Sequence, residues 1–126
     1  MIKHLTPEQA AQLREALAGV GKMLRDAMIR DPVYDYKMSR IVTWGWDCTF
    51  APSNSERYIL LPDESDLLDI LEAEGYIELG LGSENGRYGW WANPFDDGGK
   101  WGEASTRLDA LFECVLEVMR RKGEKK

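Results

Sequence analysis

The spacing of the apolar residues changes several times along this chain of 126 residues, and these changes limit the folds it can adopt. Residues 7–29 repeat their apolar positions at alternating spacings of three and four, which predicts a helix. Residues 41–50 alternate between two faces, which is the pattern of a β-strand. Both periods recur later in the chain, so the sequence predicts a mixed fold in which helices pack on a sheet.

The first predicted helix has clear start and stop signals. Thr6 can cap it, Pro7 suits its first position and Gln9 completes a capping box. We expect this helix to run to about Ile29, because Asp31 precedes a proline and is thereby disfavoured in a helix. Its apolar seam is narrow and fits one neighbouring helix, so a homodimer through this seam is one possibility. The seam residues that would pair two copies are Leu13, Leu17, Val20 and Leu24.

The middle of the chain predicts a strand, a second helix and a hairpin. Residues 41–50 form the strand with the strongest pattern, and residues 58–61 predict a shorter one. Asp63 or Ser65 caps an acidic helix that ends at Gly75. Residues 76–82 and 87–93 predict the two arms of a hairpin, because Asn85 and Gly86 favour a tight turn between them.

The end of the chain predicts a last helix over about 106–121, opened by Thr106, with a frayed tail at 123–126. Residues 100–104 read as an edge strand or a loop. The predicted fold is therefore α+β and a single domain over residues 1–126, with the sheet and the acidic helix in 41–104. Three helices pack on an antiparallel sheet of three to five strands, in the order α, β, (β), α, β, β, (β), α.

Charge is distributed unevenly, since residues 63–86 hold eight acidic residues and no lysine or arginine, against a net charge of −6 for the whole chain. The acidic residues in the first turn of the acidic helix have a local explanation, because they stabilise its dipole by about 0.3–1 kcal/mol each. Asp69, Glu72 and Glu74 lie toward the other end, with no cation three or four residues further on. The helix carries about one charge per ~3 Å, comparable with the phosphates of a nucleic-acid strand. It therefore predicts either a surface for a basic partner or a solvated face.

The tryptophans add candidate anchors for a partner. Trp44 and Trp46 share a strand face and are expected in the core, whereas Trp90 and Trp91 are adjacent and must point to opposite faces of a strand. One of these two rings is exposed unless helices cover both faces of the sheet. The predicted partner-binding residues are Asp66, Asp69, Glu72, Glu74, Glu78, Trp90, Trp91, Asp96, Asp97 and Trp101.

The sequence offers little for catalysis. The single histidine, His4, lies at the amino terminus, away from any serine or cysteine that it could activate. Cys48 and Cys114 are predicted to be buried free thiols, and no phosphate-binding loop or zinc spacing is present. We therefore expect no enzyme, no cofactor and no metal, with a metal-dependent hydrolase as the remaining enzymatic alternative. No stretch is apolar enough to cross a membrane, so a cytoplasmic protein is expected.

Two stretches of sequence carry a resemblance. Residues 60–71 read Leu-Leu-Pro-Asp-Glu-Ser-Asp-Leu-Leu-Asp-Ile-Leu, and a tryptophan-rich hairpin and then Ala-Ser-Thr-Arg-Leu-Asp-Ala-Leu at 104–111 follow. Over about residues 41–121 the chain resembles small accessory proteins of phages and prophages, in the style of phage helix–sheet–helix sandwich proteins. The resemblance implies a cytoplasmic protein without catalytic residues. Small acidic phage proteins include anti-CRISPR inhibitors, so the resemblance also implies a binding protein that blocks a basic nucleic-acid-binding complex of the host. The alternative is a structural or assembly protein that associates with itself through the N-terminal helix.

Overall fold

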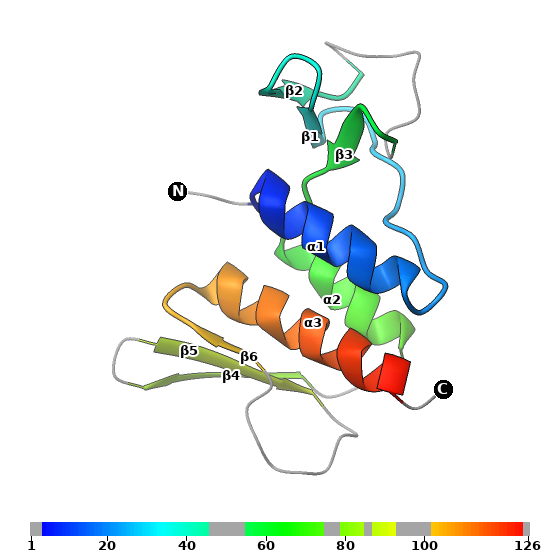
Figure 1. Cartoon of the computed structure of the whole chain (residues 1–126). Helices are drawn as coiled ribbons and strands as arrows, with labels where there is room; N and C mark the ends of the chain where they lie inside the picture. The colour runs from blue at the N-terminus through cyan, green and yellow to red at the C-terminus, as the bar shows by residue number, and fades with distance from the viewer. Residues whose placement is uncertain (1–3, 46–54, 75–78, 85–86, 93–101, 125–126) are drawn as a thin grey trace. The chain divides into compact units, whose positions relative to one another are not determined.

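The computed structural model describes residues 4–45, 55–74, 79–84, 87–92 and 102–124, which fall into two compact units, residues 2–62 and residues 63–126 (Figure 1). The units are called the N-terminal and the C-terminal unit. Helices and antiparallel strands follow one another in the predicted order, which confirms the α+β class. The N-terminal unit contains α1 (Pro7–Ala18), β1 (Pro32–Asp35), β2 (Arg40–Thr43) and β3 (Tyr58–Leu60). The C-terminal unit contains α2 (Glu64–Ala73), β4 (Leu79–Glu84), β5 (Arg87–Ala92), β6 (Gly102–Ala104) and α3 (Arg107–Glu124).

Helix α1 begins as the sequence predicts. The Thr6 hydroxyl accepts a hydrogen bond from the Gln9 amide at 3.2 Å, and the Gln9 side chain accepts one from the Thr6 amide at 3.0 Å. Pro7 occupies the first helical position, where a missing amide hydrogen leaves no bond unmade. The capping box therefore fixes the start of the helix.

The end of α1 differs from the prediction, because the helix stops at Ala18 rather than near Ile29. The Lys22 amide donates to the Leu17 carbonyl at 2.8 Å and the Gly21 amide to the Ala18 carbonyl at 3.1 Å. Gly21 has a φ of 75°. Together these features form a Schellman motif, in which a left-handed glycine ends the helix.

The N-terminal sheet has the strand order β2-β1-β3, with both pairs antiparallel. Val33 lies opposite Val42 on one side and Leu60 on the other. Strand β1 was not predicted, because four residues after the Asp31-Pro32 step are too few to show a period. Its burial alternates, with Val33 and Asp35 buried, so one face of the hairpin forms core.

That buried face holds a small apolar cluster. Val33, Val42 and Tyr58 pack together, and Trp44 lies against Tyr58 with its ring edge-on at 5.6 Å. Trp44 was predicted to lie in the core, but it is only partly buried and packs against the edge of this cluster. Its amide donates to the Asp31 carbonyl at 2.9 Å, so the backbone ladder continues one step past β2.

Asp35 is the one buried charged residue among those described, and it organises the turn between β1 and β2. Its Oδ1 accepts hydrogen bonds from the amides of Lys37 at 3.0 Å and Met38 at 3.3 Å. Arg57 donates to both carboxylate oxygens at 3.2 Å. These bonds to Arg57 hold the pKa of Asp35 below its usual value, so the carboxylate is the stable form.

In the C-terminal unit, α3 lies between the sheet and α2 (Figure 1). The sheet has the order β4-β5-β6, and the hairpin register runs from Leu79 opposite Ala92 to Glu84 opposite Arg87. Helix α3 packs on β5 and β6 with one face and contacts α2. The predicted hairpin and last helix are therefore present.

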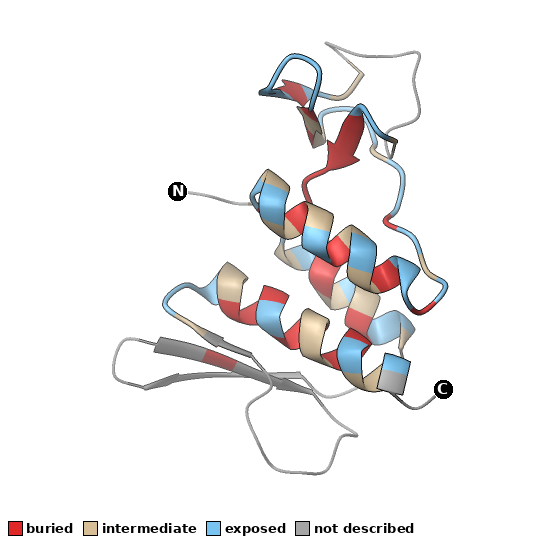
Figure 2. Ribbon diagram, viewed as in Figure 1, coloured by how far each residue is buried: buried red, intermediate tan, exposed pale blue. Residues whose placement is uncertain are grey.

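The buried faces of α2 and α3 carry the predicted apolar residues (Figure 2). Leu67 and Leu71 are fully buried in α2, and Leu111, Val115 and Met119 are buried in α3. Cys114 is a buried free thiol, as predicted, and burial raises its pKa to about 12. Helix α3 runs through Gly123 to Glu124, so the first half of the predicted frayed tail is helical. Cys48, Trp46 and the rest of 46–54 lie outside the described residues.

Candidate protein-binding surface

The acidic helix α2 begins with a capping box made of two aspartates. The Asp63 side chain accepts a hydrogen bond from the Asp66 amide at 3.0 Å, and the Asp66 side chain accepts one from the Asp63 amide at 3.1 Å. Capping side chains of this kind stabilise a helix by about 1 kcal/mol. Asp66 was predicted to bind a partner, and the structure gives it a local role in starting the helix.

Two more acidic residues of this region form ion pairs with α3. Arg107 donates to Glu64 Oε1 through Nη2 at 2.7 Å and through Nε at 3.1 Å. Lys122 Nζ lies 2.6 Å from Glu74 Oε2, and the Glu74 side chain is only 8% exposed. Glu74 was predicted to lie on an exposed acidic face, so this prediction is corrected. The cation that it lacks within its own helix comes from a residue 48 positions later.

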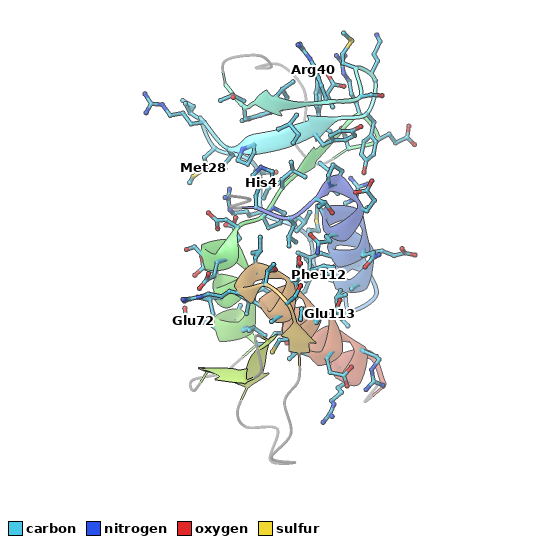
Figure 3. The ribbon with its side chains drawn as sticks, turned by 90° about the vertical axis from the view of Figure 1, so that its left-hand side faces the viewer. His4, Met28, Arg40, Glu72, Phe112 and Glu113 are labelled. Atoms are coloured by element: carbon cyan, nitrogen blue, oxygen red, sulfur yellow. The ribbon has the colours of Figure 1, made fainter. Side chains whose placement is uncertain are left out.

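Asp69 and Glu72 differ from their neighbours in α2. Both are exposed, and no described residue forms an ion pair with either of them. They are three positions apart, so their side chains lie on the same side of the helix. Figure 3 shows Glu72 on the side of α2 that faces away from α3. Asp69 and Glu72 therefore form a pair of acidic side chains that points outward from α2.

The basic end of α3 is also occupied by contacts within the chain. Arg120 and Arg121 both bind Glu117, and Lys122 binds Glu74. The bonds from Arg120 in particular hold the pKa of Glu117 below its usual value. Arg120, Arg121 and Lys122 therefore all form ion pairs within the chain.

The remaining candidate residues are only partly placed. Trp90 and Trp91 lie in β5, opposite Leu81 and Gly80 in the hairpin register, but their side chains lie outside the described part of the structure. The same holds for the whole of Glu78, Asp96, Asp97 and Trp101. Their predicted roles stay predictions.

The apolar seam proposed for a homodimer is buried in the monomer. Leu13 and Leu17 lie on α1, whereas Val20 and Leu24 follow the end of the helix. All four are less than 9% exposed. A homodimer through these four side chains stays a prediction.

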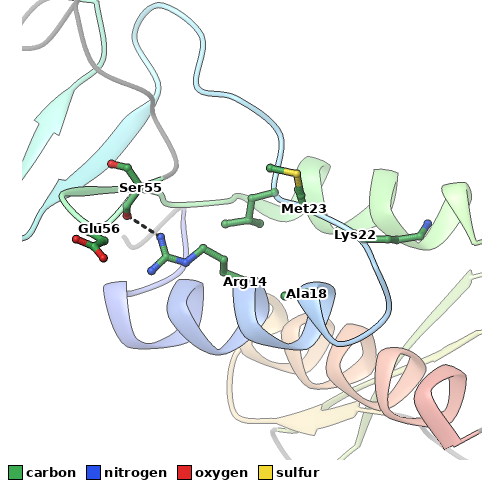
Figure 4. Close-up of a pocket in the computed structure, with 7 residues that line it drawn as sticks. Arg14, Ala18, Lys22, Met23, Ser55 and Glu56 are labelled. Carbon is green, nitrogen blue, oxygen red and sulfur yellow. Dashed lines mark hydrogen bonds between the residues drawn. The ribbon is translucent and has the colours of Figure 1, made fainter.

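An open cavity of about 300 Å³ lies in the N-terminal unit, beside the end of α1 (Figure 4). Arg14 crosses it and donates to the Ser55 carbonyl at 3.0 Å. The Ser55 hydroxyl accepts a hydrogen bond from the Tyr58 amide at 3.2 Å, so it serves the turn before β3. The cavity therefore does not join a free nucleophile to a base. Its lining residues are Arg14, Ala18, Lys22, Met23, Leu24, Ser55 and Glu56.

Searches for two other kinds of site gave negative results within the described ranges. No three histidine, cysteine, aspartate or glutamate side chains gather there as they would around a metal ion. None of the described helices combines the length and the apolar character that crossing a membrane requires.

Comparisons with protein-family models, with curated proteins and with solved structures found no match for this chain.

Proposed function

We propose that this chain is a non-enzymatic binding protein whose C-terminal unit docks on a basic protein surface through α2. The observation that carries the proposal is the exposed pair Asp69 and Glu72, which has no ion-pair partner among the described residues. The C-terminal unit holds fifteen acidic and eight basic residues, so pairing within it leaves an excess of negative charge. Such an excess accelerates and selects association with a basic partner.

In its finer form, the proposal follows the resemblance to phage accessory proteins. The partner is then a nucleic-acid-binding complex of the host, and the protein inhibits it by occupying the basic site. The contacts of Asp66 and Glu74 reduce the acidic surface that α2 can offer to such a partner, because these two carboxylates are already bonded within the chain. The helix acts through two outward acidic side chains rather than as a full mimic of a phosphate backbone.

A double charge reversal tests the docking surface. Asp69→Lys with Glu72→Lys leaves the capping box and both ion pairs to α3 in place, so α2 should still fold. The variant should lose most of its binding to a basic partner recovered from host cells, and wild-type binding should weaken steeply with salt because such attraction is screened.

The matched control reverses two exposed glutamates elsewhere, Glu15 and Glu113, and so changes the net charge by the same amount. A partner retained by wild type and by the control but lost by the α2 variant supports the proposal. For the inhibitor form, a nucleic acid must also compete with the protein for that partner. Equal recovery of every partner by all three proteins would contradict docking through α2.

A further inference from the structure

The open cavity beside the end of α1 is lined by two segments that are far apart in the sequence. Arg14 of α1 donates to the carbonyl of Ser55, 41 positions later, and so joins the helix to the turn before β3. That turn is held by two hydrogen bonds between Ser55 and Tyr58, at 2.9 Å and 3.2 Å. Both sides of this end of the cavity are therefore fixed by bonds within the N-terminal unit.

The other end of the cavity is apolar. The reversal of the chain after α1 brings Met23 and Leu24 to the cavity, where Ala18 also lines it. Leu24 is 6% exposed, whereas Met23 is 83% exposed. Figure 4 shows Ser55 and Glu56 at one end, and Met23 and Ala18 toward the other. The cavity therefore separates a polar end from an apolar one.

Two opposite charges lie at the polar end without pairing with each other. Arg14 is half-buried, and its guanidinium carries several N–H donors, one of which bonds to the Ser55 carbonyl. Glu56 is exposed, and no ion pair among the described residues joins it to Arg14 or to another cation. The amine of Lys22 extends away from both side chains (Figure 4). The other donors of Arg14 and the carboxylate of Glu56 are therefore available to a ligand.

These groups match a small zwitterion that carries an apolar side chain. A guanidinium binds a carboxylate through parallel hydrogen bonds, and a carboxylate accepts hydrogen bonds from an ammonium group. The Ser55 carbonyl has a second lone pair, so it can accept from an ammonium group as well as from Arg14. At about 300 Å³ the cavity is at the lower end of the range for small-molecule sites, which fits one amino acid rather than a peptide.

We propose that this cavity binds a free α-amino acid with an apolar side chain, such as leucine. Its carboxylate meets Arg14, its ammonium group meets Glu56 and the Ser55 carbonyl, and its side chain covers Leu24 and Met23. An apolar carboxylic acid is a poorer fit, because it offers no cation to Glu56. An apolar amine is a poorer fit, because it offers no anion to Arg14. The site is independent of the proposed function, since it lies in the other unit and its ligand is a small molecule.

The test is a titration of the full-length protein, with ¹³C-labelled methionine methyl groups, by leucine. The Met23 methyl signal should shift, and the signals of Met28, which does not line the cavity, and of Met119, in the other unit, should not. Three related ligands separate the groups of leucine. Isopentylamine lacks the carboxylate, isocaproate lacks the ammonium group, and glycine lacks the side chain. Each should bind about tenfold more weakly than leucine, because each loses one of its three contacts.

Two variants and a control assign the charges of the ligand. Arg14→Gln should weaken leucine binding about tenfold but should not weaken isopentylamine binding, because that ligand has no carboxylate. Glu56→Gln should weaken leucine binding by about threefold, since this exposed group is screened, and should not weaken isocaproate binding. Arg40→Gln removes an exposed cation of the same unit outside the cavity and should leave all these affinities nearly unchanged.

A further variant covers the case in which Arg14→Gln loosens the turn at Ser55. Arg14→Lys keeps a cation at the cavity, so this variant should still bind leucine more tightly than isopentylamine. Amide protection at Leu13 and Leu17 verifies that each variant keeps α1.

Several results would overturn the proposal. One is a Met23 signal that does not move with leucine at about 10 mM, well above a dissociation constant of about 1 mM, the weakest affinity worth considering. Another is binding of glycine or isocaproate as tight as that of leucine, which would mean that the side chain or the ammonium group is not recognised. A third is an equal loss of affinity for leucine and for isopentylamine in Arg14→Gln, which would mean that Arg14 shapes the cavity rather than binds the carboxylate.

Discussion

The two units contain the same number of basic residues but use charge differently. Residues 2–62 hold eight basic and seven acidic residues, and residues 63–126 hold eight basic and fifteen acidic ones. In the N-terminal unit the buried Asp35 is bonded inside the fold, and the exposed hairpin turn is basic and apolar. In the C-terminal unit the cations of α3 are taken up by Glu64, Glu74 and Glu117.

The difference shows that the charge a surface presents is what remains after pairing within the fold. Net charge alone would describe the N-terminal unit as nearly neutral, yet its hairpin turn presents Lys37 and Arg40 without an exposed acid. The acidic helix of the other unit presents Asp69 and Glu72 rather than its full set of carboxylates. The charged surface that each unit presents is therefore smaller than its composition suggests.

The largest expected effect is the loss of stability when a buried leucine of each unit is replaced by alanine. Leu111→Ala in α3 removes a fully buried side chain and should lower the free energy of unfolding by about 2–5 kcal/mol. Leu60→Ala, in a strand of three residues, should fall at the lower end of that range, because its surroundings can relax around the gap. Urea denaturation measures both losses. A larger loss for Leu60 than for Leu111 would reverse the comparison.

The second prediction compares the two bonded carboxylates under acid and salt. The pKa values of Asp35 and Glu117 are both lowered in the folded state, by Arg57 and by Arg120 with Arg121. Each therefore stabilises the fold at neutral pH, and this stabilisation is lost as the pH falls from the unfolded values of 3.8 and 4.5 toward the folded ones. Protection of the Lys37 and Met38 amides from hydrogen exchange, relative to their intrinsic rates, should fall over the lower part of this range.

Salt should separate these two carboxylates. The Asp35 side chain is 3% exposed and that of Glu117 is 27% exposed, so mobile ions screen the second more strongly. Carboxyl ¹³C titrations should show the Glu117 pKa rising toward its normal value in high salt while that of Asp35 stays low. Asp35→Asn, which removes the titrating group, should make the protection of the turn amides independent of pH in this range. If the turn in that variant still responds to acid, another group controls it.

The third prediction concerns the ion pair between Glu74, at the end of α2, and Lys122 of α3. Lys122→Met keeps most of the side chain's length but leaves the buried Glu74 carboxylate without this cation. Because Lys122 is itself 36% exposed, the expected cost is about 1–2 kcal/mol rather than the ~3–5 kcal/mol of a fully buried pair. A double-mutant cycle with Glu74→Gln measures the coupling. A coupling energy near zero would mean that Glu74 is held by its other contacts.

Local signals in the sequence predicted much of this fold. The capping box at Thr6 and Gln9, the start of α2 at Asp63 and the order of the C-terminal elements depend on residues that lie within a few positions of one another. Strand β1 was missed because Val33 becomes buried through pairing with Val42 and Leu60, far away in the sequence. Short-range patterns do not contain that information.

The candidate site was predicted less well for the same reason. The predicted role of Glu74 depended on the absence of a cation within its own helix, and Lys122 lies 48 positions away. The exposed turn between β1 and β2 was overlooked although Tyr36, Lys37, Met38 and Arg40 form a run of aromatic, apolar and basic residues that only Ser39 interrupts. That run could have indicated an exposed turn. It was not predicted to be a turn between two strands, because strand β1 was not predicted.

The smallest expected effect contrasts two glycines, one in each unit. Gly21→Ala should destabilise the protein by about 1–2 kcal/mol, because Gly21 has a φ of 75° and alanine is strained in that region. Gly123→Ala should stabilise it by up to ~1 kcal/mol, because Gly123 is helical and an added Cβ would meet no atom within 4 Å. Thermal unfolding of the two variants measures opposite signs for the same substitution. A destabilising Gly123→Ala would mean that the last turn of α3 depends on its glycine, while a neutral Gly21→Ala would mean that α1 can continue past Ala18, as its apolar spacing first predicts.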